Sequence, residues 1–192
     1  MKRVGVLSLQ GDFAAHGRAL ERAGAEPVYV REREQLADLD GLVLPGGEST
    51  TMLKLMKAEG LIEPLAEFGR RKPVFGTCAG AILLANEVTN PSQESLGLMD
   101  LAVERNAYGR QIDSRVVEID TAPEFQQRAA GGPLEAVFIR APIIRRLGNR
   151  ASILASYNGD PVLVEEGRHL VATFHPELTS DPRVHRYFLE KL

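Results

Sequence analysis

The stretch that decides the fold is Val74-Phe-Gly-Thr-Cys-Ala-Gly-Ala-Ile82, in which an apolar run leads through a glycine to the only cysteine and on to a second glycine. A strand that turns directly into a helix through Gly-x-nucleophile-x-Gly exposes the central residue at the carboxyl edge of a sheet. The flanking glycines remove side chains that would collide at such a turn. The pattern therefore predicts a strand over residues 74–77, a helix over residues 79–87, and Cys78 as a nucleophile between them.

The helix that follows Cys78 bears on its chemistry. Free amide hydrogens at a helix N-terminus point toward the sulfur and favour the thiolate, and the amide of Ala79 is placed to donate to an oxyanion. The alternative is a small buried apolar side chain, which is what most free cysteines are. Because 18 of the 192 residues are glycine, two flanking glycines arise by chance about one time in a hundred. The motif alone favours a nucleophile only moderately, and it needs a base.

Outward from this turn, strand-like and helical patterns alternate through the first half of the chain, which indicates βαβ units and a parallel sheet. The second half carries shorter strands and suggests antiparallel or mixed pairing. We expect an α/β fold with a mixed, mostly parallel central sheet flanked by helices. The further strands are expected over residues 3–9, 25–30, 41–44, 101–104, 115–119, 136–139, 152–156, 161–165 and 170–174, and the further helices over residues 13–23, 51–59 and 183–192.

Composition excludes several classes of protein. A chain of 192 residues with 44% hydrophobic and 26% charged residues suits one globular domain, residues 1–192. A net charge of −3 without a dense basic run argues against a nucleic-acid partner. No apolar run approaches the length that spans a membrane, and no signal-peptide core is present, so we expect a cytoplasmic protein. Zinc-ligand spacing is missing, so no metal is expected. A phosphate-binding glycine loop is missing too, so phosphosugar and nucleotide substrates are not expected to bind this chain.

The candidate base is His175, which ends an apolar strand and precedes Pro176 and Glu177. Catalytic groups commonly lie at this edge of a parallel sheet. Proline stiffens the backbone, and the carboxylate two residues beyond the ring can return to hydrogen-bond it and set its tautomer. A strand-terminal histidine before a turn is ordinary by itself, but the combination with Cys78 points to nucleophilic catalysis. The other histidines are His16 and His185, expected on helix surfaces, and His169, expected after a hairpin turn.

Gly76-Thr-Cys-Ala-Gly80 together with His175-Pro-Glu177 resembles the class I, or triad, glutamine amidotransferases. The match runs in order from Leu9 to the C-terminus. Further segments are similar to one subfamily, the glutaminase subunits of pyridoxal 5'-phosphate synthases; they are LQG at residues 9–11, PGGEST at 45–50, VERN at 103–106, FIRAP at 138–142 and the segment 179–188. The resemblance implies a flavodoxin-like three-layer sandwich.

The activity that the resemblance implies is hydrolysis of L-glutamine to L-glutamate and ammonia through a cysteine thioester. The ammonia passes to a separate synthase subunit, which makes vitamin B6, and no cofactor is implied for this chain. Free glutaminase subunits of this type are expected to be poorly active until the synthase docks, because the oxyanion peptide must be turned into position.

The resemblance also assigns residues. It implies a triad of Cys78, His175 and Glu177 and an oxyanion hole from the turn at Gly46 and from Ala79. Gln10 lies in the region that contacts the synthase. Arg105 and Arg140 are expected to grip the α-carboxylate of glutamine, and Glu48 to face its α-ammonium, because the substrate carries both charges. The full set expected around the substrate is Gly47, Glu48, Ser49, Arg105, Ile139 and Arg140.

Two other functions stay open on the sequence alone. A related α/β cysteine hydrolase would use the same turn for peptidase or aldehyde chemistry, without requiring both arginines and Glu48. A regulatory subunit could retain the fold without catalysis, although a complete Cys-His-Glu set argues against it. The segment 118–134, with Gln126 to Gly132, maps onto no family motif and receives no role.

Overall fold

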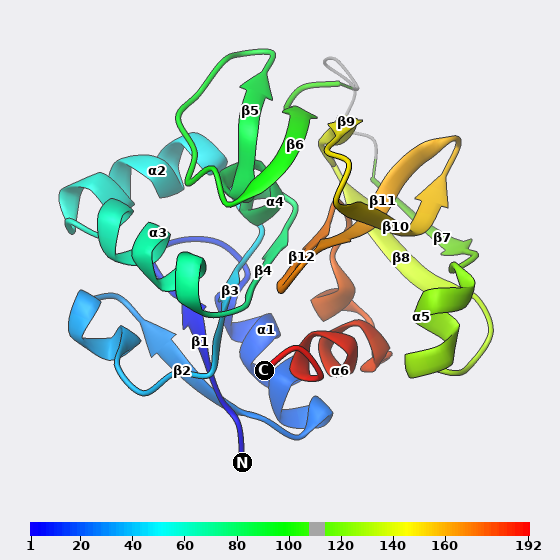
Figure 1. Ribbon diagram of the computed structural model, residues 1–192, viewed down its shortest axis with the longest axis horizontal. Coiled ribbons are helices and arrows are strands. Elements are labelled where there is room, and N and C mark those ends of the chain that lie inside the picture. Colours follow the sequence, from blue (N-terminus) through cyan, green and yellow to red (C-terminus); the bar gives the residue numbers. More distant parts are fainter. Residues whose placement is uncertain (108–113) are drawn as a thin grey trace.

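A seven-stranded sheet forms the centre of the computed structural model, which describes residues 1–107 and 114–192 (Figure 1). Five neighbouring strands run parallel, and two antiparallel strands extend one edge. In spatial order the strands are β10 (Ala151–Tyr157), β11 (Asp160–Glu166), β12 (His169–Ala172), β4 (Val74–Thr77), β3 (Gly41–Leu44), β1 (Arg3–Leu7) and β2 (Glu26–Val30).

Helices and two small sheets cover the faces of this sheet (Figure 1). One face is covered by α2 (Ser49–Ala58), α3 (Ile62–Arg71), α4 (Ala79–Leu84) and a sheet of β5 (Ala85–Thr89), β6 (Met99–Glu104) and β9 (Ile143–Leu147). The other is covered by α1 (Phe13–Ala23), α5 (Pro123–Arg128), α6 (Arg183–Leu189) and a hairpin of β7 (Ser114–Ile119) and β8 (Leu134–Ile139). Two short 3-10 turns complete the elements, Arg33–Leu36 and Pro176–Leu178.

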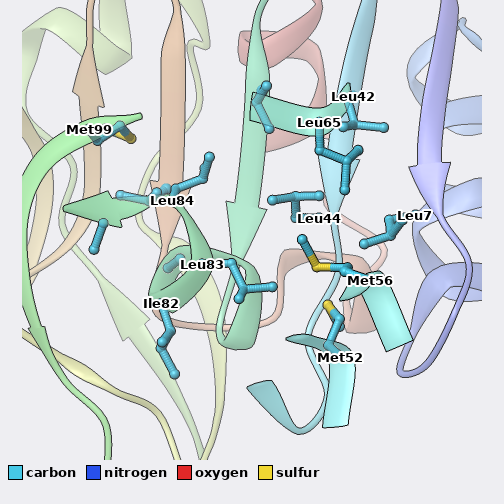
Figure 2. Close-up of a cluster of buried hydrophobic side chains, with 14 of the residues drawn as sticks. Leu7, Leu42, Leu44, Met52, Met56, Leu65, Ile82, Leu83, Leu84 and Met99 are labelled. Atoms are coloured by element: carbon cyan, nitrogen blue, oxygen red, sulfur yellow. The ribbon is translucent and has the colours of Figure 1, made fainter. Parts of the chain in front are cut away.

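The core lies on both faces of the sheet because the parallel strands are buried on both sides. In β3, Leu42 and Leu44 point to one apolar cluster and Val43 to the other. Figure 2 shows Leu42 and Leu44 on the first side, with Met52 and Met56 of α2 close to them. The expected three-layer α/β sandwich with a mixed, mostly parallel sheet is confirmed.

Several elements end earlier than the sequence predicts, and some were not predicted at all. The helix expected over residues 79–87 ends at Leu84, because residues 85–89 leave the helix and pair with β6 as strand β5. Sequence reasoning missed α3, α5 and β9. The first strand ends at Leu7 and β12 at Ala172, both two residues earlier than expected, and the closing helix ends at Leu189.

The segment 118–134, which matched no motif, forms the end of β7, helix α5 and an exposed loop. The guanidinium of Arg183, at the start of α6, donates to the carbonyl oxygens of Gly131 and Gly132. Phe125 of α5 is fully buried against Tyr187. The segment therefore covers α6. Among the described residues, no helix is both long and apolar enough to cross a membrane.

Candidate active site

Cys78 occupies a sharp turn between β4 and α4. Its backbone has φ 48° and ψ −105°, in the left-handed region that side chains rarely adopt. Such strain costs on the order of 1–3 kcal/mol and concentrates at functional sites. The turn persists because its surroundings fix it: the Cys78 amide donates to the Ala172 carbonyl across the sheet at 2.9 Å. A Cβ on Gly80 would lie 1.9 Å from the Leu44 carbonyl oxygen, so this glycine lets α4 start against β3.

His175 and Glu177 meet Cys78 from the end of β12. The His175 amide donates to the Val137 carbonyl at 2.8 Å, which fixes the ring's backbone. The 3-10 turn that Pro176 begins brings Glu177 back, and its Oε1 lies 2.7 Å from His175 Nδ1. Burial opposes the charged ring, but hydrogen bonds with Cys78 and Glu177 outweigh it and raise the pKa of His175 to about 10. Glu177 is thus hydrogen-bonded to the ring, Cys78 favours its charged form, and the imidazole is protonated at neutral pH.

The turn after β3 lies close to the side chains of Cys78 and His175. A Cβ on Gly46 would be 2.5 Å from His175 Cε1 and 3.4 Å from Cys78 Cβ. Two hydrogen bonds fasten the turn to the segment after β1: the Asp12 amide donates to the Gly46 carbonyl at 3.1 Å, and the Glu48 amide donates to Gln10 Oε1 at 3.0 Å. The backbone that was expected to supply the oxyanion hole is therefore close to Cys78 and His175 and is hydrogen-bonded to Gln10.

Replacing Gly46 by alanine is expected to lower kcat about 10-fold to 100-fold while leaving the fold intact, because the new methyl group displaces the His175 ring, and small misplacements of catalytic groups have effects of this size. Steady-state glutaminase assays and a thermal melt measure the two quantities. Gly132→Ala is the matched control, since a Cβ there meets nothing within 4 Å. If Gly46→Ala retained full activity, the close approach of this turn to His175 would be wrong.

A pocket of about 380 Å³ opens beside Cys78, within the range of small-molecule sites. Sequence reasoning had singled out ten of its lining residues: Gln10, Gly47, Glu48, Ser49, Cys78, Ala79, Arg105, Ile139, Arg140 and His175. Gly46 and Glu177 are not among the lining residues, and both contact His175. Three lining residues were missed. Asp12 follows the LQG motif, Asn106 ends VERN, and Ile82 lies one helical turn after Cys78, so adjacency to motifs was the available signal.

Charges of both signs line the pocket. The side chain of Arg105 is 12% exposed, and its Nη2 donates to Thr50 Oγ1 at 2.7 Å and lies 3.4 Å from Glu48 Oε1. Glu48 also caps helix α2 by accepting from the amides of Thr50 and Thr51. Although partial burial opposes the shift, hydrogen bonds with Thr51 and Thr50 lower the pKa of Glu48. Arg105 is therefore held in place from one side, and the carboxylate of Glu48 is ionised.

One group of described side chains is close enough to share a metal ion. Ligand atoms of Asp12, His175 and Glu177 all lie within 4.8 Å of one another. Asp12 Oδ2 is 3.7 Å from His175 Nδ1, the same nitrogen that Glu177 already contacts at 2.7 Å. An ion bound there would have to break the His175–Glu177 hydrogen bond.

The expectation that His16 and His185 are surface side chains is wrong. Both are fully buried, at the contact between α1 and α6. His16 Nδ1 lies 3.0 Å from His185 Nε2, and His16 Nε2 lies 2.9 Å from Thr77 Oγ1. Polar neighbours in sequence misled the prediction because the two helices bury these faces against each other and the sheet. His169 opens β12, and its Nδ1 accepts from the Val74 amide.

A thiol, an imidazole and a carboxylate meet at the carboxyl ends of parallel strands, under a glycine turn in an α/β sandwich, and this is the arrangement expected of a glutamine amidotransferase. The model of the SNO glutamine amidotransferase family matches residues 6–192. The chain belongs to this family.

Curated relatives and solved structures agree with this family. The chain is 70% identical over the full length of both chains to "Pyridoxal 5'-phosphate synthase subunit PdxT" of Solibacter usitatus. It is 51% identical to the subunit of that name from Thermotoga maritima, over 98% of both chains. A crystal structure titled as a glutamine amidotransferase superposes with a TM-score of 0.88 at 46% identity, covering 98% of this chain and 97% of the other. The structure of PurLQS from Thermotoga maritima, at 20% identity and a TM-score of 0.72 over 98% of both chains, supports the fold alone.

Proposed function

We propose that this protein is the glutaminase subunit of a pyridoxal 5'-phosphate synthase. It hydrolyses L-glutamine to L-glutamate and ammonia, and it delivers the ammonia to a separate synthase subunit for vitamin B6 synthesis. The observation that carries the chemistry is that Cys78 and His175 line one pocket with charges of both signs, and that Glu177 is hydrogen-bonded to the His175 ring. The full-length relatives named as synthase subunits support the biological role.

The reaction follows from the order of the three groups. The sulfur of Cys78 attacks the side-chain amide carbon of glutamine, and the protonated ring of His175 gives its proton to the departing nitrogen, which leaves as ammonia. A water molecule, deprotonated by the now neutral ring, then attacks the thioester and releases glutamate. Glu177 holds the ring in the required orientation through both steps.

Two backbone amides stabilise the oxyanion of each tetrahedral intermediate. One comes from Ala79 at the start of α4 and the other from the turn at Gly46 and Gly47. Loss of one such donor typically costs about 2.7–4 kcal/mol of barrier stabilisation. The turn's present hydrogen bonds, to the Asp12 amide and to Gln10, are the contacts that would change if the synthase turned the peptide on docking. Gln10 would therefore transmit the contact with the synthase.

The pocket discriminates glutamine by its charged end. Arg105 and Arg140 bind the α-carboxylate, and Glu48 faces the α-ammonium. The backbone of Gly47, together with Ser49 and Ile139, completes the wall of the pocket. Arg105 suits this role because its side chain is fastened by Thr50 before the substrate arrives.

The cellular setting follows from the same chemistry. Residues 1–192 act as one glutamine amidotransferase domain. The protein works in the cytoplasm, where reducing conditions keep a lone nucleophilic thiol free of disulfides. Phosphosugar substrates bind to the synthase and not to this chain, because the sequence contains no phosphate-binding glycine loop.

The test combines a synthase-dependence assay with a chemical label. Glutamate release is measured with and without purified synthase, and the complex is then incubated with an electrophilic glutamine analogue and digested for mass spectrometry. We expect release that requires the synthase and a single adduct on Cys78 that excess glutamine suppresses. No release with the synthase present, together with an adduct that glutamine leaves unchanged, would instead favour a peptidase-like or aldehyde-directed hydrolase.

A further inference from the structure

A buried histidine pair, His16 and His185, lies next to Glu177, and neither ring lines the pocket. Glu177 uses Oε1 to contact His175, and among the described residues its buried Oε2 has no hydrogen-bond partner of standard geometry. The ring of His16, from α1, faces this oxygen with Nε2 at 3.4 Å. On its other side, His16 contacts His185 of α6. A buried carboxylate oxygen without a donor is costly, so this contact needs an explanation.

The hydrogen-bond partners select one tautomer of His16. His185 Nδ1 is buried and has no partner among the described residues. An unpaired acceptor nitrogen is tolerated better than an unpaired N–H donor, so His185 carries its proton on Nε2 and donates to His16 Nδ1. A neutral His16 then carries its own proton on Nε2. His16 Nε2 is hydrogen-bonded to Thr77 Oγ1 at 2.9 Å, and Glu177 Oε2 lies 3.4 Å from the same nitrogen.

Both rings are neutral in the folded protein. Burial, followed by the charges of His185 and His175, lowers the pKa of His16 well below its ordinary value. Burial, followed by the charge of Arg22, lowers the pKa of His185 to about 3. Neither ring is therefore a charged imidazolium that could give up a proton to the triad at neutral pH. What His16 supplies is a polar Nε2 group next to the carboxylate, 3.4 Å from Oε2.

We propose that His16 is a positioning residue for the proposed triad: its Nε2–H holds Oε2 of Glu177, so that Oε1 faces His175 and the carboxylate stays ionised. The proposal rests on the function proposed above. Burial raises the pKa of Glu177 even though the hydrogen bond with His175 opposes the rise, so a second donor has a definite task. Among the described residues, the charged or titratable groups facing Glu177 are His175, His16 and Asp12, and those facing His16 are His185, His175 and Glu177.

The substitutions His16→Gln and His16→Asn form a matched pair. The amide nitrogen of glutamine reaches the place of Nε2 and can donate to Glu177, whereas that of asparagine reaches only the place of Nδ1. We expect His16→Gln to keep kcat within about threefold and His16→Asn to lose about 10-fold to 100-fold in kcat with KM unchanged, the size typical of lost outer-sphere partners. His169→Asn, another buried histidine outside the triad, controls for general effects of burying an amide.

The pH dependence separates positioning from mere stability. A donor to an ionised carboxylate lowers its pKa, so removing the donor raises it. The acid limb of kcat should therefore move up by about one pH unit in His16→Asn and stay in place in His16→Gln and His169→Asn. The same shift should occur in the rate of Cys78 alkylation by iodoacetamide in the free chain, which requires neither glutamine nor the synthase.

Each outcome decides the proposal. A shift of both profiles in His16→Asn alone supports it, and thermal melts confirm that the variants are folded. If the pH profiles of kcat and of alkylation are the same for His16→Gln and His16→Asn, the proposal is wrong. If His16→Asn fails to fold, a shift of the acid limb in His16→Gln also overturns the proposal. The alkylation profile tests the arrangement of Cys78, His175 and Glu177 even if the protein hydrolyses no glutamine, so failure of the proposed function would be recognised separately.

Discussion

Replacing Cys78 by alanine is expected to reduce glutamate release by the synthase-bound protein to the background of the assay, a loss on the order of 10⁶-fold in kcat for a triad nucleophile. The reason is that the remaining groups have nothing to activate. His175 and Glu177 are arranged around the sulfur and cannot form the thioester without it. The measurement is steady-state glutamate production with saturating synthase and glutamine.

The substitution should leave the protein folded and able to bind its partner. Alanine removes only the thiol group of Cys78. It also places no polar group at this position, where the residue is only 7% exposed to solvent. Co-purification with the synthase and an unchanged thermal midpoint provide the controls. Undiminished glutamate release from Cys78→Ala would defeat the proposed function outright, because no other cysteine exists in the chain to replace this one.

Replacing Gly80 by alanine is expected to lower the free energy of unfolding by about 3 kcal/mol or more, the upper range for overpacking a core. The added Cβ would lie 1.9 Å from the carbonyl oxygen of Leu44 and 3.0 Å from its Cβ, so either α4 or β3 has to move. Neither obstacle is the flexible end of a side chain. Activity should fall as well, since α4 begins at the residue after Cys78.

Chemical denaturation of Gly80→Ala, with Gly132→Ala as the control, measures this effect. Alanine at residue 132 enters open space and should change stability by less than about 0.5 kcal/mol. A midpoint for Gly80→Ala equal to that of the control would mean that α4 does not pack against β3 as closely as described. The comparison thus tests the geometry of the nucleophile turn independently of catalysis.

The local chemistry of the site was readable from the sequence. Glycines around Cys78 and the His-Pro-Glu order after an apolar strand describe short-range geometry, in which a few adjacent residues fix the backbone. The expected β3, β4 and α1 agree with the structure for the same reason. Gly46, Arg105 and Arg140 were placed by family resemblance, since nothing in their own surroundings distinguishes them from ordinary turn or surface residues.

The features that could not be predicted from the sequence depend on packing between segments that are distant in the chain. Residues 85–87 continue the expected helical pattern, yet they belong to β5 because β6 offers backbone partners that lie more than ten residues away. His16 and His185 have polar neighbours in sequence, but they are 169 residues apart and meet only where α1 packs on α6. A helix face becomes interior or surface according to what the rest of the chain places against it.

The sequence by itself therefore predicted Cys78 and His175 as partners at one edge of the sheet, together with the parallel α/β framework, because each is written in adjacent residues and in periodicity. Only the tertiary structure decided that Asp12 lies beside the His175 ring and that a neutral histidine pair backs Glu177. Those contacts join segments distant in the chain, and their energies depend on burial, which no local pattern specifies.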